Sequence, residues 1–297
     1  MSTAKQMVQA APSSAGLFGR LARVVRYREL LFNLIRRELR ARYKESVLGF
    51  LWSMLTPVLY LVVFYVVFTI FLPTGIPAFP VFLLSGLLPW TLFASSLAGG
   101  AGSIVSNGAL LKKVYFPREV LPLASIGGAL FHFFLQMLVL LGFMLVFRYP
   151  FTNEYLVLVP LALLVEIVLL AGLCLLLSGL TVYLRDIQHF LELALLAWFW
   201  MTPIVYQVGL VFDKLTPRGL FGLYLLNPMT TIVMSFQRAF YNQTAPRVNG
   251  NVTHILLDRP IGWYLQHLGW VAAAGLALVV VGQFVFARIE ANFAEEL

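Results

Sequence analysis

The chain has 297 residues, of which 60% are hydrophobic and 11% are charged, and its formal net charge is +8. Soluble chains contain about 45–50% apolar and about 25% charged residues, so this composition excludes a soluble domain and also a disordered or collagen-like chain. A single cysteine, Cys174, excludes a disulfide framework. The sequence therefore predicts an integral membrane protein.

Two segments precede the predicted membrane domain. Residues 1–16 are small and polar and lack the apolar core of a cleaved signal peptide, so we expect them to be disordered. Residues 17–46 are predicted to form an amphipathic helix at the cytoplasmic membrane surface, with Leu31, Ile35 and Leu39 on its apolar face. The opposite, basic face carries Arg36, Arg37, Arg40 and Lys44. A solvated charge cluster that only sets the topology is the alternative interpretation.

The remaining apolar stretches predict six membrane-spanning helices within a transmembrane domain at 47–287. Residues 46–111 contain no charged residue or histidine, which is enough for two spans joined where PTGIPAFP cannot be helical. The apolar runs are continuous and longer than barrel strands, so we expect an all-α bundle. The spans are predicted at 47–72, 80–105, 120–147, 155–184, 190–211 and 262–287, and a cytoplasmic tail at 288–297.

The basic residues predict the orientation of the chain. Most of the 21 lysines and arginines precede the first span or fall in the tail and in the loops that follow spans two and four. The positive-inside rule then places both termini in the cytoplasm. Because the basic segment adjoins a span, we expect it to meet membrane lipids and not nucleic acid.

A long outer loop separates spans five and six. Residues 219–236 are apolar enough to suggest a seventh span, but Asn227 and Pro228 interrupt them, and a seventh span would move the C-terminus outside. We therefore predict a re-entrant pair of short helices at about 219–240. Non-helical backbone at membrane depth persists only inside protein or beside water, so this pair suggests the mouth of a pore.

Few residues in the predicted spans are suited to chemistry. The sequence has no P-loop and no zinc-binding motif. Glu166 is the one carboxylate deep within a span, where it should face a partner or a wet cavity; a substrate-path role and a structural hydrogen bond both stay open. Glu192 is expected near the cytoplasmic interface, where it caps a helix or pairs with Arg185.

Three consecutive aromatic residues, Trp198, Phe199 and Trp200, fall near mid-depth of span five. Core packing or lipid contact is one interpretation. A passage for a sugar polymer is the other, because aromatic rings suit the C–H faces of sugars. Composition does not decide between them.

Five segments spread over residues 36–297 carry a family resemblance. They are RRELRARYKESVLGFLWSMLTP (36–57), SNGALLKKVYFPREVLPLAS (106–125), YLRDIQHFLELALLAWFWMTPIVY (183–206), LNPMTTIVMSFQRAF (226–240) and FARIEANFAEEL (286–297). In order and topology they resemble the permease subunit of ABC-2-type exporters of polysaccharides and polyol phosphates, the group that exports O-antigen, teichoic acid and capsule.

The resemblance implies a six-span permease in the bacterial inner membrane that forms a homodimer with a channel between its protomers. It implies a lipid-linked polysaccharide as substrate and a separate cytoplasmic ATPase, in two copies, which binds ATP and Mg; no cofactor is expected in this chain, and it is not expected to be an enzyme. Alternatives are an ABC-2 permease for drugs or lipids, which generally lacks a loop like KKVYFPRE, and a membrane-embedded glycosyl- or acyltransferase. For the latter, Glu166 and His132 are a thin set of catalytic groups.

The resemblance also implies roles for four groups of residues. The ATPase-coupling surface would comprise Asn107, Lys112, Lys113, Tyr115, Phe116, Arg118 and Glu119, with a smaller contact at Arg185 and Asp186. The interface helix would meet lipid phosphate through Arg36, Arg40, Arg42 and Lys44. The channel lining would include Trp198, Phe199, Trp200, Tyr206 and Glu166. The outer gate would include Pro203, Asn227 and Pro228.

Overall fold

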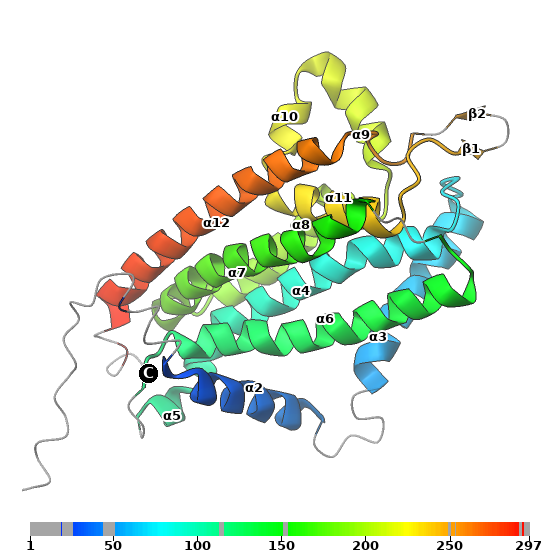
Figure 1. The fold of residues 1–297 in the computed structure, drawn as a ribbon. Coiled ribbons are helices and arrows are strands. Elements are labelled where there is room, and N and C mark those ends of the chain that lie inside the picture. The colour runs from blue at the N-terminus through cyan, green and yellow to red at the C-terminus, as the bar shows by residue number, and fades with distance from the viewer. Residues whose placement is uncertain are drawn as a thin grey trace, which may run out of the picture.

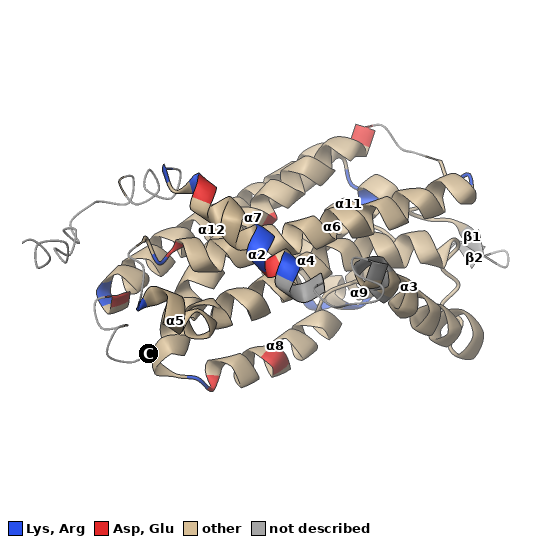
Figure 2. Cartoon of the chain, turned by 90° about the horizontal axis from the view of Figure 1, so that it is seen from below, with Lys and Arg blue, Asp and Glu red and all other residues tan. Residues whose placement is uncertain are grey.

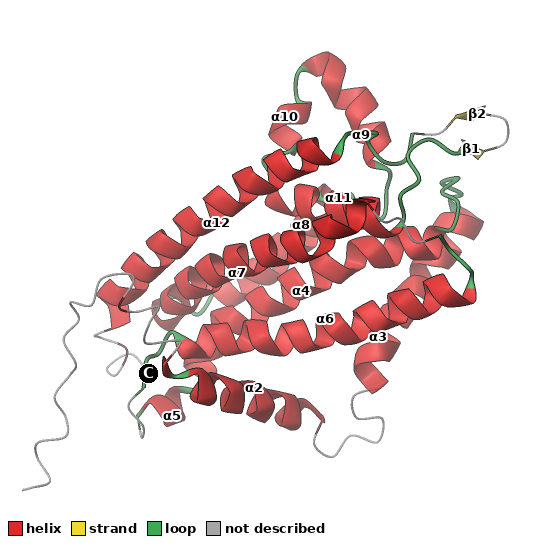
Figure 3. Ribbon diagram, viewed as in Figure 1, coloured by secondary structure: helices red, strands yellow, loops and turns green. Residues whose placement is uncertain are grey.

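The computed structural model describes residues 19, 26–43, 51–112, 116–150, 154–248, 251–252, 254–290 and 293. Long helices form a bundle, and a two-residue antiparallel strand pair, β1 (Arg247–Val248) and β2 (Asn251–Val252), lies at one end of it (Figures 1 and 3). The opposite end, here called the α5 end, holds α5 (Gly108–Leu111) and the last turn of α12 (Figure 1). The predicted helical membrane fold is confirmed.

Four of the described helices are long and apolar enough to cross a membrane. They are α4 (Phe79–Ser106), α6 (Val120–Val146), α7 (Leu158–Tyr183) with the preceding turn η2 (Glu154–Val157), and α12 (Ile261–Ile289). Charged residues gather on α2 and near the helix ends, and long uncharged stretches lie between them (Figure 2). This arrangement suits a bilayer, because a charge at its centre is costly.

Two shorter apolar helices accompany these four. The first is α3 (Leu51–Tyr65), which continues into the π-helical segment η1 (Val66–Phe71). The second is α8 (Ile187–Met201). Of the four candidate spans, α4 is the most buried. In its most apolar stretch, 78% of the residues lie inside the protein. The central cavity described below opens beside α4.

The prediction of a continuous helix over 190–211 is wrong, because α8 ends at Met201. Proline has no backbone N–H and drives the preceding residue toward extended backbone. Thr202, which precedes Pro203, has φ −106° and ψ 137°. Residues 202–207 then run without helix until α9 (Val208–Leu215) begins.

The region predicted as a re-entrant pair is uneven in length. It begins after the 3-10 turn η3 (Thr216–Arg218) with the single-turn helix α10 (Phe221–Tyr224), and continues as α11 (Pro228–Phe240). Every residue of α11 after Pro228 is buried, among α4, α7 and α12. The second half of the predicted pair is therefore part of the protein core.

Helices α7 and α12 approach each other at the level of their backbones. A Cβ atom added to Gly172 would lie 2.6 Å from the backbone nitrogen of Val279, and one added to Gly282 would lie 2.6 Å from the carbonyl oxygen of Gly172. Only glycine permits this spacing. Small residues at helix contacts are typical of membrane bundles, where close van der Waals packing replaces the hydrophobic drive.

The amphipathic helix predicted before the first span is observed as α2 (Arg28–Tyr43), which packs along α6. Leu34 is buried, and Ile35 occupies a notch at Gly127, where an added Cβ would overlap its Cδ1 atom. Arg36 and Arg40 are exposed. The predicted disorder of residues 1–16 lies outside the described residues, as do Lys44 and the side chain of Arg42.

Candidate functional site

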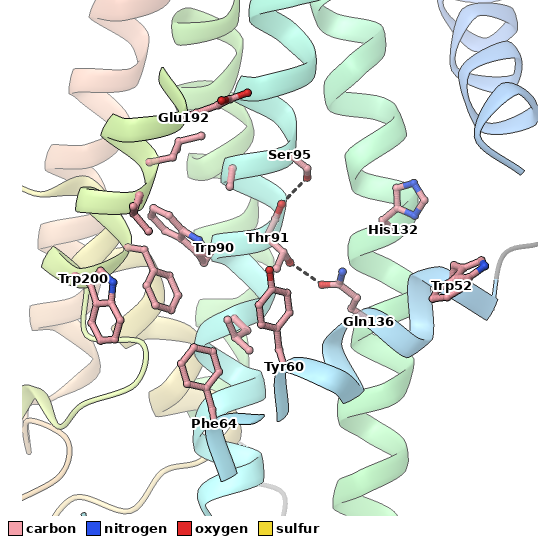
Figure 4. Close-up of a pocket in the computed structure, with 15 residues that line it drawn as sticks. Trp52, Tyr60, Phe64, Trp90, Thr91, Ser95, His132, Gln136, Glu192 and Trp200 are labelled. Carbon is pink, nitrogen blue, oxygen red and sulfur yellow. Dashed lines mark hydrogen bonds between the residues drawn. The ribbon is translucent and has the colours of Figure 1, made fainter. Parts of the chain in front are cut away.

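A cavity of about 860 Å³ lies between α3, α4, α6 and α8 (Figure 4). Aromatic side chains form much of its wall: Trp52, Tyr60, Phe64, Trp90, Phe199 and Trp200. Phe199 lies at the centre of this group, with its ring centroid 5.6 Å from that of Trp90 and 5.5 Å from that of Trp200, both in edge-to-face geometry. Half of the Trp200 side chain surface, 53%, remains exposed. The wall therefore offers flat aromatic surface, part of which is exposed.

Polar side chains of α4 and α6 face the same space. Thr91 Oγ1 donates to Gln136 Oε1 at 2.6 Å, and Ser95 Oγ donates to the carbonyl oxygen of Thr91 (Figure 4). In the first bond the Gln136 amide accepts through its oxygen, which leaves its N–H₂ group available as a donor. His132 and Glu192 complete the polar part of the lining. The cavity thus combines aromatic faces with hydroxyl, amide and carboxylate groups.

Two smaller recesses continue the cavity toward the α5 end. One, of about 390 Å³, is lined by Gly102 and Gln188 and shares Glu192 with the main cavity. The other, of about 240 Å³, is lined by Glu38 of α2 and shares Ser95 and His132 with it. The three spaces adjoin one another along α4 through these shared wall residues, and together they are here called the groove.

The predicted channel residues divide into two sets. Phe199 and Trp200 line the cavity. Trp198 lies outside it: its Nε1 atom donates to Asn227 Oδ1 at 2.7 Å, and its ring meets Phe93 edge to face at 4.9 Å. A single α-helix turns about 100° per residue, so three consecutive aromatic residues cannot share one face.

Tyr206 and Glu166 also lie outside the cavity lining. The Tyr206 hydroxyl is 3.1 Å from the Tyr224 hydroxyl, which joins the end of the α8 segment to α10. Glu166 is fully buried in α7, and neither of its carboxylate oxygens has a hydrogen-bond partner in the described structure. Neither a wet cavity nor an inter-helix hydrogen bond is therefore seen at Glu166.

The predicted gate residues meet at one junction. Asn227 caps α11, because its side-chain oxygen accepts from the Met229 backbone nitrogen at 3.0 Å as well as from Trp198. Its Nδ2 atom donates to Thr202 Oγ1 at 3.0 Å. The carbonyl oxygen of Pro203 accepts from Gln237 Nε2 at 2.9 Å, and Pro228 occupies the first position of α11. One asparagine therefore joins the end of α8 to the start of α11.

An arginine anchors the other end of α11. Arg238 is 4.2 Å from the centre of the Tyr155 ring, and its Nη2 atom is 3.3 Å from Asp258 Oδ1. Nearby, the Tyr149 hydroxyl donates to the carbonyl oxygen of Tyr241 at 2.6 Å. Burial raises the pKa of Tyr149 to about 12, although a hydrogen bond with Gln243 lowers it in part. Tyr149 therefore remains a neutral donor.

The predicted coupling residues are partly turned inward. Phe116 and Glu119 are buried, with 5% and 3% of their surface exposed. Arg118 donates to the carbonyl oxygen of Glu290 and lies 5.5 Å from the centre of the Phe293 ring, so it holds the end of α12. Lys112 is exposed. Lys113 and Tyr115 lie outside the described residues.

Two further coupling residues, Arg185 and Asp186, are exposed in the turn between α7 and α8. Asn107 ends α4, and its side-chain oxygen accepts from Arg37 of α2. The role of Arg37 was missed, because a bond across 70 residues leaves no local pattern. Glu192 lines the main cavity and one recess, and the predicted ion pair with Arg185 is not seen in the described part of the chain.

Comparison with known proteins decides the family. A sequence model of the ABC-2 type transporter family matches residues 29–241. The chain belongs to this family. It is therefore a transport permease and not an enzyme.

Named relatives of the permease come from two export systems. The O-antigen export system permease protein RfbA of Myxococcus xanthus is 37% identical over 221 residues, which cover 74% of this chain and 83% of the relative. The protein of the same name from Klebsiella pneumoniae is 28% identical over 91% of this chain and 95% of its own length. The polysialic acid transport protein KpsM of Escherichia coli is 35% identical over 31% of this chain and 35% of its own.

Proposed function

We propose that this permease is the membrane subunit of an ATP-driven exporter that carries a lipid-linked polysaccharide across the bacterial inner membrane. The O-antigen permeases that match most of the chain support this proposal. The observation that carries it is the cavity at Phe199 and Trp200, where exposed aromatic faces oppose Thr91 and Gln136. Sugars bind well to such walls, because aromatic rings contact their C–H faces while polar groups bond their hydroxyls.

Six spans are part of the proposal. α3 and η1 together run over Leu51–Tyr65 and Val66–Phe71, which is about 30 Å of helix and enough for the hydrocarbon core. α8 has only 15 residues. Residues 202–205, which extend it, are buried, and irregular backbone is tolerated at membrane depth under that condition.

Both termini lie in the cytoplasm in this proposal. The arginines of α2 are near the α5 end, and the positive-inside rule places such residues on the cytoplasmic side. The ATPase then docks at the α5 end, on Lys112 and on Arg185 and Asp186, which are exposed there. The permease has no P-loop, so the ATPase supplies the ATP chemistry in this proposal. We expect two copies of this ATPase.

A second copy of the permease completes the passage in this proposal. The cavity opens between α3 and α8, and Trp52, Tyr60 and Trp200 each expose about half of their surface there. A facing protomer would close this opening and present the same aromatic wall again. The exposed arginines of α2, Arg36 and Arg40, would meet the phosphates of the lipid carrier.

Export of polymer to the cell surface tests the proposal. In cells that lack the native permease gene, Trp200→Ala is expected to lower surface polysaccharide at least several-fold, because it removes half-exposed cavity wall. Trp270→Ala is the matched control, since Trp270 is 69% exposed on α12 and does not line the cavity. Equal export by both variants would refute the assignment of the cavity.

Co-purification of the ATPase tests the coupling surface. Lys112→Glu is expected to reduce the amount of P-loop ATPase recovered with the permease, because it reverses an exposed charge at the α5 end. Lys214→Glu, an exposed lysine of α9, is the control. Undiminished recovery with Lys112→Glu would remove this loop from the docking surface.

A further inference from the structure

The groove along α4 separates positive from negative charge. Its described lining contains two carboxylates, Glu192 beside the main cavity and Glu38 in the smaller recess, and no lysine or arginine. The arginines of α2 lie elsewhere: Arg36 and Arg40 are exposed, and Arg37 bonds Asn107. Among the described side chains, cationic groups therefore stand on the surface near the groove and not along it.

This charge arrangement disfavours an acidic polymer. An anion that leaves water for a space of low dielectric needs a compensating cation or several hydrogen-bond donors, and a carboxylate nearby adds repulsion. Glu192 is shared by the main cavity and one recess, so a polymer in either space would pass it. A chain with a charge on every unit would meet this repulsion repeatedly.

The same lining favours an uncharged, hydroxyl-rich polymer. Thr91 fixes the oxygen of the Gln136 amide, so the N–H₂ group is left to donate to a hydroxyl oxygen. The Glu192 carboxylate accepts from hydroxyl protons, and bonds to a charged acceptor are the stronger kind. The aromatic rings of Phe199 and Trp200 line the same cavity; Glu192 lies on α8 with them, and Gln136 lies on α6. Both halves of a neutral sugar ring thus find a partner.

We infer that the groove selects uncharged, hydroxyl-rich polysaccharides against polyanionic ones, with Glu192 and Gln136 as its specificity-determining residues. This inference rests on the proposed function and narrows it. It separates the permease from a polysialic acid transporter, whose substrate is acidic, although KpsM of Escherichia coli resembles 31% of this chain. The phosphate of a lipid carrier would stay with the surface arginines.

Binding to the full-length permease in lipid nanodiscs tests the inference. Tryptophan fluorescence is followed at pH 8 while a neutral glucose oligomer or an oligosialic acid of equal length is added. Three of the six tryptophans, Trp52, Trp90 and Trp200, line the cavity and report binding. The neutral oligomer is expected to bind at least about tenfold more tightly than the acidic one.

Variants assign this preference to the named residues. Glu192→Gln should strengthen binding of the acidic oligomer several-fold and so narrow the gap, meaning the difference in affinity between the two oligomers. Glu192→Lys should narrow that difference further. Gln136→Leu should weaken binding of the neutral oligomer while leaving the acidic one at its low level. Asp213→Asn, which changes the same charge on an exposed residue of α9, should alter neither.

The outcomes distinguish a failure of this inference from a failure of the proposed function. Equal or tighter binding of the acidic oligomer, or a gap that Glu192→Gln leaves unchanged, overturns the inference and leaves the proposed function standing. If neither oligomer quenches the fluorescence, the cavity does not bind saccharide, and the proposed function falls together with the inference.

Discussion

The junction at Asn227 makes a quantitative prediction about stability. Its side-chain oxygen accepts from the Met229 backbone nitrogen at 3.0 Å and from Trp198 Nε1 at 2.7 Å, and its Nδ2 atom donates to Thr202 Oγ1 at 3.0 Å. Asn227→Ala removes all three bonds. Loss of a helix N-cap costs about 1 kcal/mol, and an unpaired N–H in a partly buried site costs about 1–3 kcal/mol.

The combined loss is therefore roughly 2–4 kcal/mol of unfolding free energy. Since 1 kcal/mol moves the midpoint of a chain of this size by about 2–4 °C, the melting temperature should fall by roughly 4–16 °C. Asn227→Asp retains the acceptor oxygen and should lose less than half as much.

The chain contains a reporter suited to this measurement. Cys174 is the single cysteine of the sequence, and its side chain is fully buried. A thiol-reactive fluorophore therefore reacts only after unfolding, and its fluorescence during heating in detergent gives the midpoint. Asn33→Ala, an exposed asparagine of α2, is the matched control. If Asn227→Ala melts within about 1 °C of the control, the junction is not a stabilising element and the reasoning is refuted.

The remaining predictions are checked by the recovery of folded protein and by the same thermal assay. Gly282→Val should abolish or severely lower recovery of folded protein, because its Cβ would lie 2.6 Å from the Gly172 carbonyl oxygen, whereas Gly142→Ala should be tolerated, since nothing lies within 4 Å of its added Cβ. Full recovery of Gly282→Val would contradict the close packing of α7 and α12. Arg238→Ala should destabilise by about 2 kcal/mol, since it removes a buried cation 4.2 Å from the Tyr155 ring. Asp258→Ala should cost less than about 1 kcal/mol, because that carboxylate is 81% exposed, and equal losses for the two variants would place the energy in the ion pair.

Sequence reasoning was effective where one physical variable dominates. Apolar length predicts α4, α6, α7 and α12 within a few residues, because hydrocarbon demands continuous helix. The end of α8 was also accessible, since Pro203 forbids the helix that apolarity alone extends to residue 211. Composition was given more weight there than backbone chemistry.

The site was less predictable, because it depends on which way side chains point. Trp198 and Trp200 are equal in composition, yet the turn of the helix sends one into a hydrogen bond with Asn227 and leaves the other at the cavity. The bond between Thr91 and Gln136 joins residues 45 apart. No local pattern reveals such a pair, so the polar side of the cavity was missed entirely.

Arg118 illustrates a related difficulty. A basic residue in a loop is usually expected to be exposed, and the family resemblance implies a docking role for Arg118. Its guanidinium bonds the carbonyl oxygen of Glu290 and lies near the Phe293 ring, a contact that the sequence did not predict. A helix end has unpaired carbonyl groups that attract cations, but their location becomes known only when α12 is placed beside the loop.

The notch at Gly127 has a mechanical consequence. Ile35 of α2 fits into the surface of α6 at Gly127, where a larger residue would require the Ile35 side chain to shift, and Leu34 is buried beside it. Such a close-packed contact resists sliding of one helix along the other, so α2 would move together with α6 if α6 tilted. The arginines on the outer side of α2 would then sweep across the headgroup layer whenever α6 rocks.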